Sequence, residues 1–151
     1  MAVTAYWYAR AILAAFNKEI DFKGATDDPY VMLTTSTYTP NQDTHDYKDD
    51  ITNEVSGTGY VANGAQLAND DFTQTNNVDK WDSDDPSWAS STITMRRAVY
   101  YDRSPATDAT RPVICWVDAG ADVTTAAGTL TIVQDAAGIA TITATDATGF
   151  P

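Results

Sequence analysis

The chain has 151 residues, of which 43% are hydrophobic and 20% charged, as expected for one globular domain with a full core. Nine lysines and arginines stand against 21 aspartates and glutamates, which gives a formal net charge of −12. This balance excludes the basic footprint that nucleic acids and anionic membranes attract. We therefore expect a protein that binds neither and that stays soluble through its acidity.

Cysteine usage and the N-terminus bear on where the chain is made. The one cysteine, Cys115, lies in the strand-like run 113–117, which predicts a buried thiol and no intrachain disulfide. No basic region precedes the first apolar residues, and no apolar stretch approaches about 18 residues. We expect neither a signal peptide nor a transmembrane span, and a chain compatible with a reducing cytoplasm.

The segment from Ala5 to Ile20 has the periodicity of an amphipathic helix, with Thr4 as the predicted N-cap. Apolar residues recur every three or four positions at Ala9, Ile12, Leu13, Phe16 and Ile20. We divide the chain into an N-terminal helix or arm, residues 1–20, and a β domain, residues 21–151. The helix either packs on its own sheet or forms an arm that lies on a partner. The aromatic run Tyr6, Trp7 and Tyr8 would favour the arm.

The remainder of the chain predicts an all-β fold, an antiparallel β-sandwich or partly open barrel, because short strand-like runs alternate with turn signals about every ten residues. The predicted strands cover residues 30–38, 51–55, 60–67, 91–101, 112–117, 128–134 and 139–145, with shorter strands between 69 and 86. A hairpin through residues 135–138 joins the last two, and Asp118-Ala119-Gly120 follows the strand before them. Arg97 falls on the apolar face of its strand, which predicts a change of register or exposure there.

No catalytic or metal-binding motif is present in the sequence. A single histidine, His45, and the lack of a G-x-S-x-G motif argue against a catalytic triad, and one Cys with one His cannot form a Cys/His zinc site. Two acidic clusters lack the spacing and central glycine of an EF-hand: Asp43, Asp46, Asp49 and Asp50, and Asp79, Asp82, Asp84 and Asp85. We therefore expect no enzyme, no metal and no cofactor, with calcium binding at either acidic cluster as the alternative to a charged loop.

Five aromatic residues of the β domain have two interpretations. They are Trp81, Trp88, Tyr100, Tyr101 and Trp116. They either fill the core or, if several are exposed together, form a protein-binding or sugar-stacking surface.

Three segments together resemble a group of tailed-bacteriophage virion structural proteins. They are NKEID at 17–21, VMLTTSTYTPNQDTHDYKDDITNEVSGTGY at 31–60 and SWASSTITMRRAVYYDRSPATDATRPVICWVDAGAD at 87–122. Their order and spacing cover most of residues 10–145, and the group is associated with capsid decoration (minor capsid or cement) proteins. One departure is the middle segment, residues 69–81, which is more acidic than the resemblance would lead us to expect.

The resemblance implies a small β-rich protein, made in the host cytoplasm, that binds the major capsid protein on the exterior of the assembled virion shell. Such a protein would fold either alone or as a small homo-oligomer, a dimer or trimer, and the resemblance carries over no catalytic residues. We expect partner contacts from the segment 6–16 and the loop 41–50. The candidate contact residues are Tyr6, Trp7, Tyr8, Leu13, Phe16, Asp43, His45 and Tyr47. A phage tail or fibre component and a carbohydrate-binding virion surface module remain as alternatives.

Overall fold

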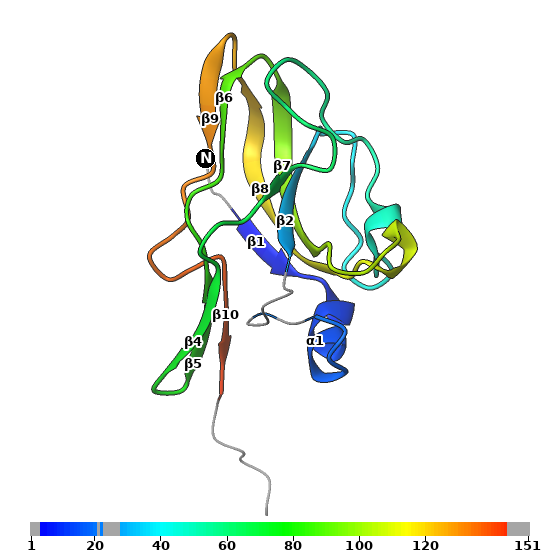
Figure 1. Cartoon of the computed structure of the whole chain (residues 1–151), viewed down its shortest axis with the longest axis vertical. Coiled ribbons are helices and arrows are strands. Elements are labelled where there is room, and N and C mark those ends of the chain that lie inside the picture. Colours follow the sequence, from blue (N-terminus) through cyan, green and yellow to red (C-terminus); the bar gives the residue numbers. More distant parts are fainter. Residues whose placement is uncertain (1–3, 21, 23–27, 145–151) are drawn as a thin grey trace, which may run out of the picture.

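A computed structural model describes residues 4–20, 22 and 28–144 of the chain (Figure 1). The described part is mostly antiparallel β-structure in three sheets, with one α-helix, α1 (Ala9–Phe16). The five-stranded sheet has the order β1 (Thr4–Trp7), β8 (Val113–Thr124), β7 (Thr94–Asp102), β2 (Pro29–Thr34) and β3 (Ala65–Gln66). The three-stranded sheet has the order β10 (Ala140–Thr143), β5 (Val78–Asp82) and β4 (Asp71–Thr75), and β6 (Ser87–Ser91) pairs with β9 (Gly128–Thr131).

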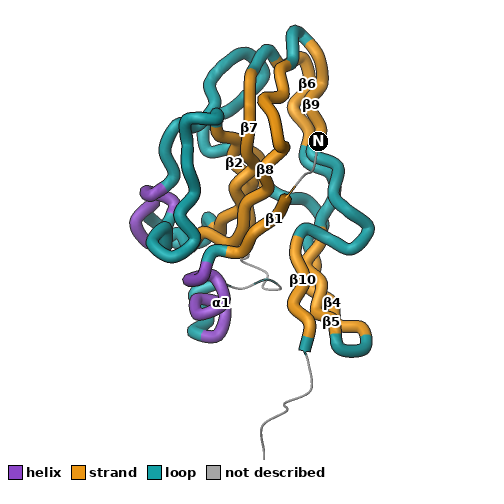
Figure 2. Tube along the Cα trace, turned by 180° about the vertical axis from the view of Figure 1, so that it is seen from behind, coloured by secondary structure: helices purple, strands orange, loops and turns teal. Residues whose placement is uncertain are grey.

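The core lies on both faces of the five-stranded sheet. On one face, Tyr100 of β7 packs edge-to-face against Trp81 of β5, with ring centroids 5.9 Å apart. On the other face, Trp116 of β8 packs against Tyr8, with centroids 4.5 Å apart. Figures 1 and 2 show the smaller sheets on one side of the five-stranded sheet, and much of the long loops 35–64 and 103–112 on the other side.

The all-β fold with an N-terminal helix is confirmed, and none of the described sheets closes into a barrel. The five aromatic residues whose role the sequence left open belong to the core: Trp81, Trp88, Tyr100, Tyr101 and Trp116 are all buried. The predicted change at Arg97 is also present, because the pairing of β7 with β8 shifts register between Met95 and Arg97. Arg96 and Arg97 both contact the Asp118 carboxylate there, at 2.5 and 3.0 Å, which satisfies two cations at the edge of an apolar face.

The predicted helix from Ala5 was wrong over its first turn and its N-cap. Residues 4–7 form β1, whose aromatic residues favour a strand once β8 offers a pairing edge, and Tyr8 takes the N-cap position. The helix also ends before Ile20, at Phe16. Lys18 adopts a left-handed φ of 60°, and the Glu19 amide donates to the Ala14 carbonyl at 2.8 Å, which is a Schellman termination.

Several strand predictions also need correction. Residues 51–55 contribute one isolated bridge, between Glu54 and Thr34, and residues 60–67 contribute only β3. The strand from residue 113 continues through 118–120 to Thr124. The last two strands do not form a hairpin, because β9 pairs with β6 and β10 pairs with β5; residues 144 and 145 lie outside the observed β10, and 145 lies outside the described residues.

Candidate functional site

Helix α1 turns its large apolar side chains outward. It rests on the rest of the fold through Ala11 and Ala14, which are fully buried, and small side chains of this kind allow a helix to approach a sheet closely. In contrast, Ile12 is 42% exposed, Leu13 is 51% exposed and Phe16 is 84% exposed. A helix that only covered its own core would show the reverse pattern.

An apolar groove of about 280 Å³ runs between α1 and the three-stranded sheet. We call it the helix groove. Its walls include Ile12 and Phe16 from α1, Phe72 from β4 and Ile142 from β10, and Asp79 of β5 contributes the one carboxylate among its lining residues. Phe22 supports this side, since its ring stacks on Phe72 with centroids 5.1 Å apart. The groove therefore offers apolar walls and one negative charge.

The predicted contact residues Tyr6, Trp7 and Tyr8 alternate between the two faces of the sheet, because they lie on or directly after strand β1. The Tyr6 ring is 45% exposed and stacks on Trp116 with centroids 5.0 Å apart. Tyr8 is buried on the same face. Trp7 lies on the opposite face, where it lines the helix groove.

The Tyr8 hydroxyl is fixed inside the fold. It lies 2.8 Å from the Tyr38 hydroxyl, which lies 2.9 Å from Nδ1 of His45. Burial raises the pKa of the Tyr8 hydroxyl far above its ordinary value, and the neighbouring Tyr38 adds to this effect. Both phenols therefore stay protonated, and the pair anchors the loop that carries His45.

The acidic loop 39–50 packs beside the start of α1. The Gln42 carbonyl accepts a hydrogen bond of 3.0 Å from the Ala9 amide, which satisfies a donor of the first helical turn. Arg10 of the helix donates to the Tyr47 hydroxyl at 2.9 Å and to Glu19 at 2.7 Å. Asp43 is exposed. The structure thus brings the two predicted contact regions together, with His45 and Tyr47 holding the loop and Leu13, Phe16 and Asp43 facing outward.

The sequence alone did not identify the wall of the helix groove that lies opposite α1. Phe72 and Ile142 are distant from α1 along the chain, and only the tertiary arrangement makes them its neighbours. A partial signal existed, because Phe72 is an isolated apolar residue in a polar stretch. Ile142 is 38% exposed and pairs with Asp79, so both residues lie on the groove face of that sheet.

Cys115 is buried as predicted, and burial raises the pKa of its thiol. Across residues 4–20, 22 and 28–144, no three His, Cys, Asp or Glu side chains come close enough to hold a metal ion. No helix in the described part of the chain has the length and apolar character needed to cross a membrane.

No protein-family model, curated protein or solved structure matches this chain.

Proposed function

We propose that this protein decorates the capsid of a tailed bacteriophage, binding the outer surface of the assembled major capsid shell and stabilising it. The observation that supports the proposal is the exposed apolar face of α1, Ile12, Leu13 and Phe16, beside the helix groove. Contiguous exposed apolar surface marks an interaction site on a soluble protein. The resemblance of three chain segments to phage virion proteins supports the major capsid protein as the proposed partner.

The proposed mechanism is linkage rather than catalysis. A protein that binds only the assembled shell stabilises it, because dissociation of the shell must then also release the bound protein. Each copy would bury on the order of 1,000 Å² or more, unless many weak contacts act together across the lattice. The face of α1 would supply the apolar centre of this interface, and the exposed acidic loop residue Asp43 would lie at its polar rim.

The test is cosedimentation of the purified protein with empty capsid shells of the phage that encodes it. The double variant Leu13→Ser, Phe16→Ser should bind at least tenfold more weakly, because apolar anchors at the centre of an interface dominate its affinity. A matched control is Val61→Ser, Val133→Ser, since these valines are 72% and 75% exposed and neither lines the helix groove. The control should bind as the unmodified protein does.

Electron cryomicroscopy of the same particles separates the alternatives. Density over the capsid lattice is the expected result. Density confined to the tail, with a bare shell, would replace the proposal with a tail or fibre role. In the cosedimentation assay, equal losses of shell binding in the Leu13→Ser, Phe16→Ser variant and in the valine control would show that α1 is not the contact surface.

A further inference from the structure

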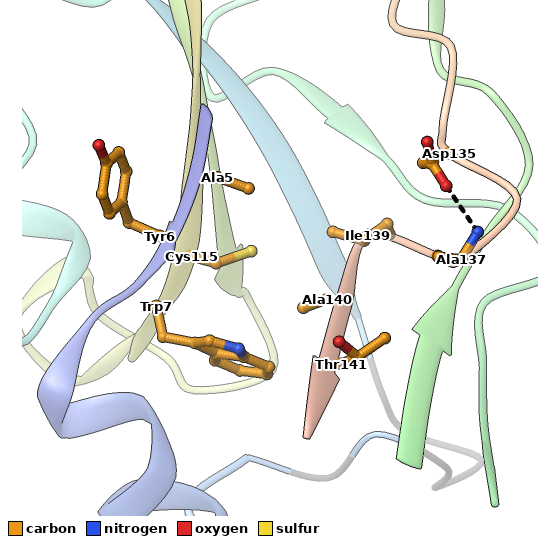
Figure 3. Close-up of a pocket in the computed structure, with 10 residues that line it drawn as sticks. Ala5, Tyr6, Trp7, Cys115, Asp135, Ala137, Ile139, Ala140 and Thr141 are labelled. Atoms are coloured by element: carbon orange, nitrogen blue, oxygen red, sulfur yellow. Dashed lines mark hydrogen bonds between the residues drawn. The ribbon is translucent and has the colours of Figure 1, made fainter. Parts of the chain in front are cut away.

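Two sheet edges face each other across a second groove (Figure 3). Strand β1 is the last strand of the five-stranded sheet and pairs only with β8, and β10 is the last strand of the three-stranded sheet and pairs only with β5, within the described residues. The space between them measures about 360 Å³, and we call it the edge slot. Its lining includes Ala5, Trp7 and Cys115 on one side and Ile139, Ala140 and Thr141 on the other.

The hydrogen-bond phase of β1 leaves main-chain groups of Ala5 and Trp7 at the edge of the sheet that borders the slot, while the side chains of both residues line the slot itself. The Tyr8 amide donates to the Ile114 carbonyl at 3.1 Å. Hydrogen-bonded residues alternate along an antiparallel pair, so Tyr6 also bonds β8, whereas Ala5 and Trp7 direct their N–H and C=O groups away from it. The Trp7 carbonyl agrees with this phase, since it accepts a hydrogen bond of 2.7 Å from the Gln42 side chain. Gln42 thereby occupies the Trp7 carbonyl.

The same reasoning applies to β10. The Ala144 amide donates to the Asn77 carbonyl at 2.8 Å, in register with the pairing of β10 and β5. Ile142 and Ala140 therefore bond β5, and Thr141 directs its N–H and C=O groups away from that strand. Donors and acceptors of two separate sheets thus border one slot.

We propose that the edge slot receives an extended segment of a partner chain, which adds to β1 as a new strand and also contacts β10. Main-chain hydrogen bonds would supply affinity, as in other cases of strand addition to a free edge. The four residues of β1 span about 13 Å, which sets the length of the paired segment at about four residues. Small residues at the slot, Ala5, Ala137 and Ala140, leave room for an incoming backbone.

Charge defines the chemistry of that segment. The chain carries a net charge of −12, and Asp135 lines the slot, so a segment with a lysine or arginine beside small apolar residues is the complementary ligand. Trp7 lines both the edge slot and the helix groove, which makes the two surfaces continuous. A segment leaving the slot past Trp7 would therefore place an apolar side chain between α1 and the three-stranded sheet. This inference rests on the proposed function, in which the capsid subunit supplies the segment.

Proline substitution tests the inference with little disturbance of the fold. Ala5→Pro and Thr141→Pro each remove an amide donor that points away from its partner strand at the border of the slot, and proline is tolerated at such positions of edge strands. Gln74→Pro is the matched control, because Gln74 lies on the outer strand β4. Thr75 and Val78 flank a two-residue turn and form a hydrogen-bonded pair, and hydrogen-bonded residues alternate along the strand. The Gln74 amide therefore also points away from its partner strand.

The probes are empty capsid shells and a panel of ten-residue peptides of alternating valine and threonine, with one lysine at successive positions. We expect a panel member to bind and to slow amide hydrogen exchange at Ala5 and Thr141. Each slot proline should weaken binding of that peptide and of shells at least tenfold, whereas Gln74→Pro should not, and all three variants should melt within a few degrees of the unmodified protein.

The outcomes separate the two proposals. If no peptide binds, or if the slot prolines bind both probes as the unmodified protein does, strand addition is refuted even where shells are still bound. If peptides bind and the slot prolines abolish this binding while shells are not bound at all, strand addition holds and the capsid role fails. Should a slot proline unfold the protein, hydrogen exchange at Ala5 and Thr141 in the unmodified protein with and without peptide decides the question alone.

Discussion

Trp81 is the side chain that most directly joins the three-stranded sheet to the five-stranded sheet. It is fully buried, and its ring contacts Phe22 at 5.3 Å and Tyr100 at 5.9 Å between centroids. A buried tryptophan removes about 150–250 Å² from water, which at about 25 cal/mol per Å² corresponds to about 4–6 kcal/mol as an upper bound. Its indole N–H finds no hydrogen-bond acceptor among the described residues, and such a group costs about 1–3 kcal/mol.

Trp81→Ala should therefore lower the free energy of unfolding by about 3 kcal/mol, because the lost burial is partly offset by removal of the unpartnered N–H. For a chain of this length, the melting temperature should fall by about 6–12 °C. Trp81→Phe should cost within about 1 kcal/mol, since it keeps an aromatic ring between Phe22 and Tyr100 and removes the same N–H.

Urea and thermal unfolding, followed by circular dichroism, would measure both Trp81 variants. Tyr6→Ala provides a half-exposed aromatic control and should cost about 1 kcal/mol. A loss below about 1 kcal/mol for Trp81→Ala would mean that the two sheets are not joined through this ring. Equal losses for the alanine and phenylalanine variants would show that an aromatic ring between Phe22 and Tyr100 contributes nothing, and a loss well above 1 kcal/mol for Trp81→Phe would refute the offset assigned to removal of the indole N–H.

Three further predictions concern charge, backbone and thiol. Hydrogen bonding from Lys48 holds the pKa of Asp108 below its ordinary value, so this carboxylate stabilises the fold above about pH 4 and the contribution is lost as the pH falls further. Asp108→Asn should lower the free energy of unfolding by about 1 kcal/mol at pH 7, a small value because the carboxylate is half exposed. The melting temperature of the variant should also fall less between pH 5 and 3 than that of the unmodified protein. An equal fall in the two proteins would contradict the prediction. Gly64→Ala should cost about 1–3 kcal/mol in urea unfolding, because φ is +83° and a Cβ would meet a β2 carbonyl, whereas Gly128→Ala, with open space around its Cβ, should be near neutral. The Cys115 thiol, whose pKa burial raises, should react with a thiol reagent only after unfolding, and rapid labelling of the folded protein would refute its burial.

Local pattern was sufficient to predict the fold class but not the strand partners. The β-branched and aromatic runs of β2, β7 and β8 are strands in any arrangement, because their side chains suit a pleated, buried surface. The turn at 135–138 was visible, yet it does not join a hairpin, since β9 and β10 pair with strands of different sheets. Local turn chemistry carries no information about such distant partners.

The N-terminal segment shows the same limit at the candidate site. The three- and four-residue spacing of its apolar residues corresponds to a helix only from Ala9 to Phe16. At residues 4–7 the chain instead forms a strand, because it pairs with β8. Leu13 and Phe16 could be selected as contact residues from the sequence. The opposite wall of the helix groove could not, because Phe72 and Ile142 reach α1 only through the packing of the three-stranded sheet.

The composition of α1 is better explained by binding than by folding. A helix of eight residues is marginal in isolation and depends on tertiary contacts, which here pass through Ala11 and Ala14. Polar residues at the exposed positions Leu13 and Phe16 would preserve those contacts and remove apolar surface from water. A net charge of −12 opposes association between copies in solution, so an apolar face can remain exposed until a surface of complementary charge covers it. Under the proposed function, the acidic exterior and the apolar helix face would act together, because repulsion would suppress self-association and a basic, apolar partner surface would complement both.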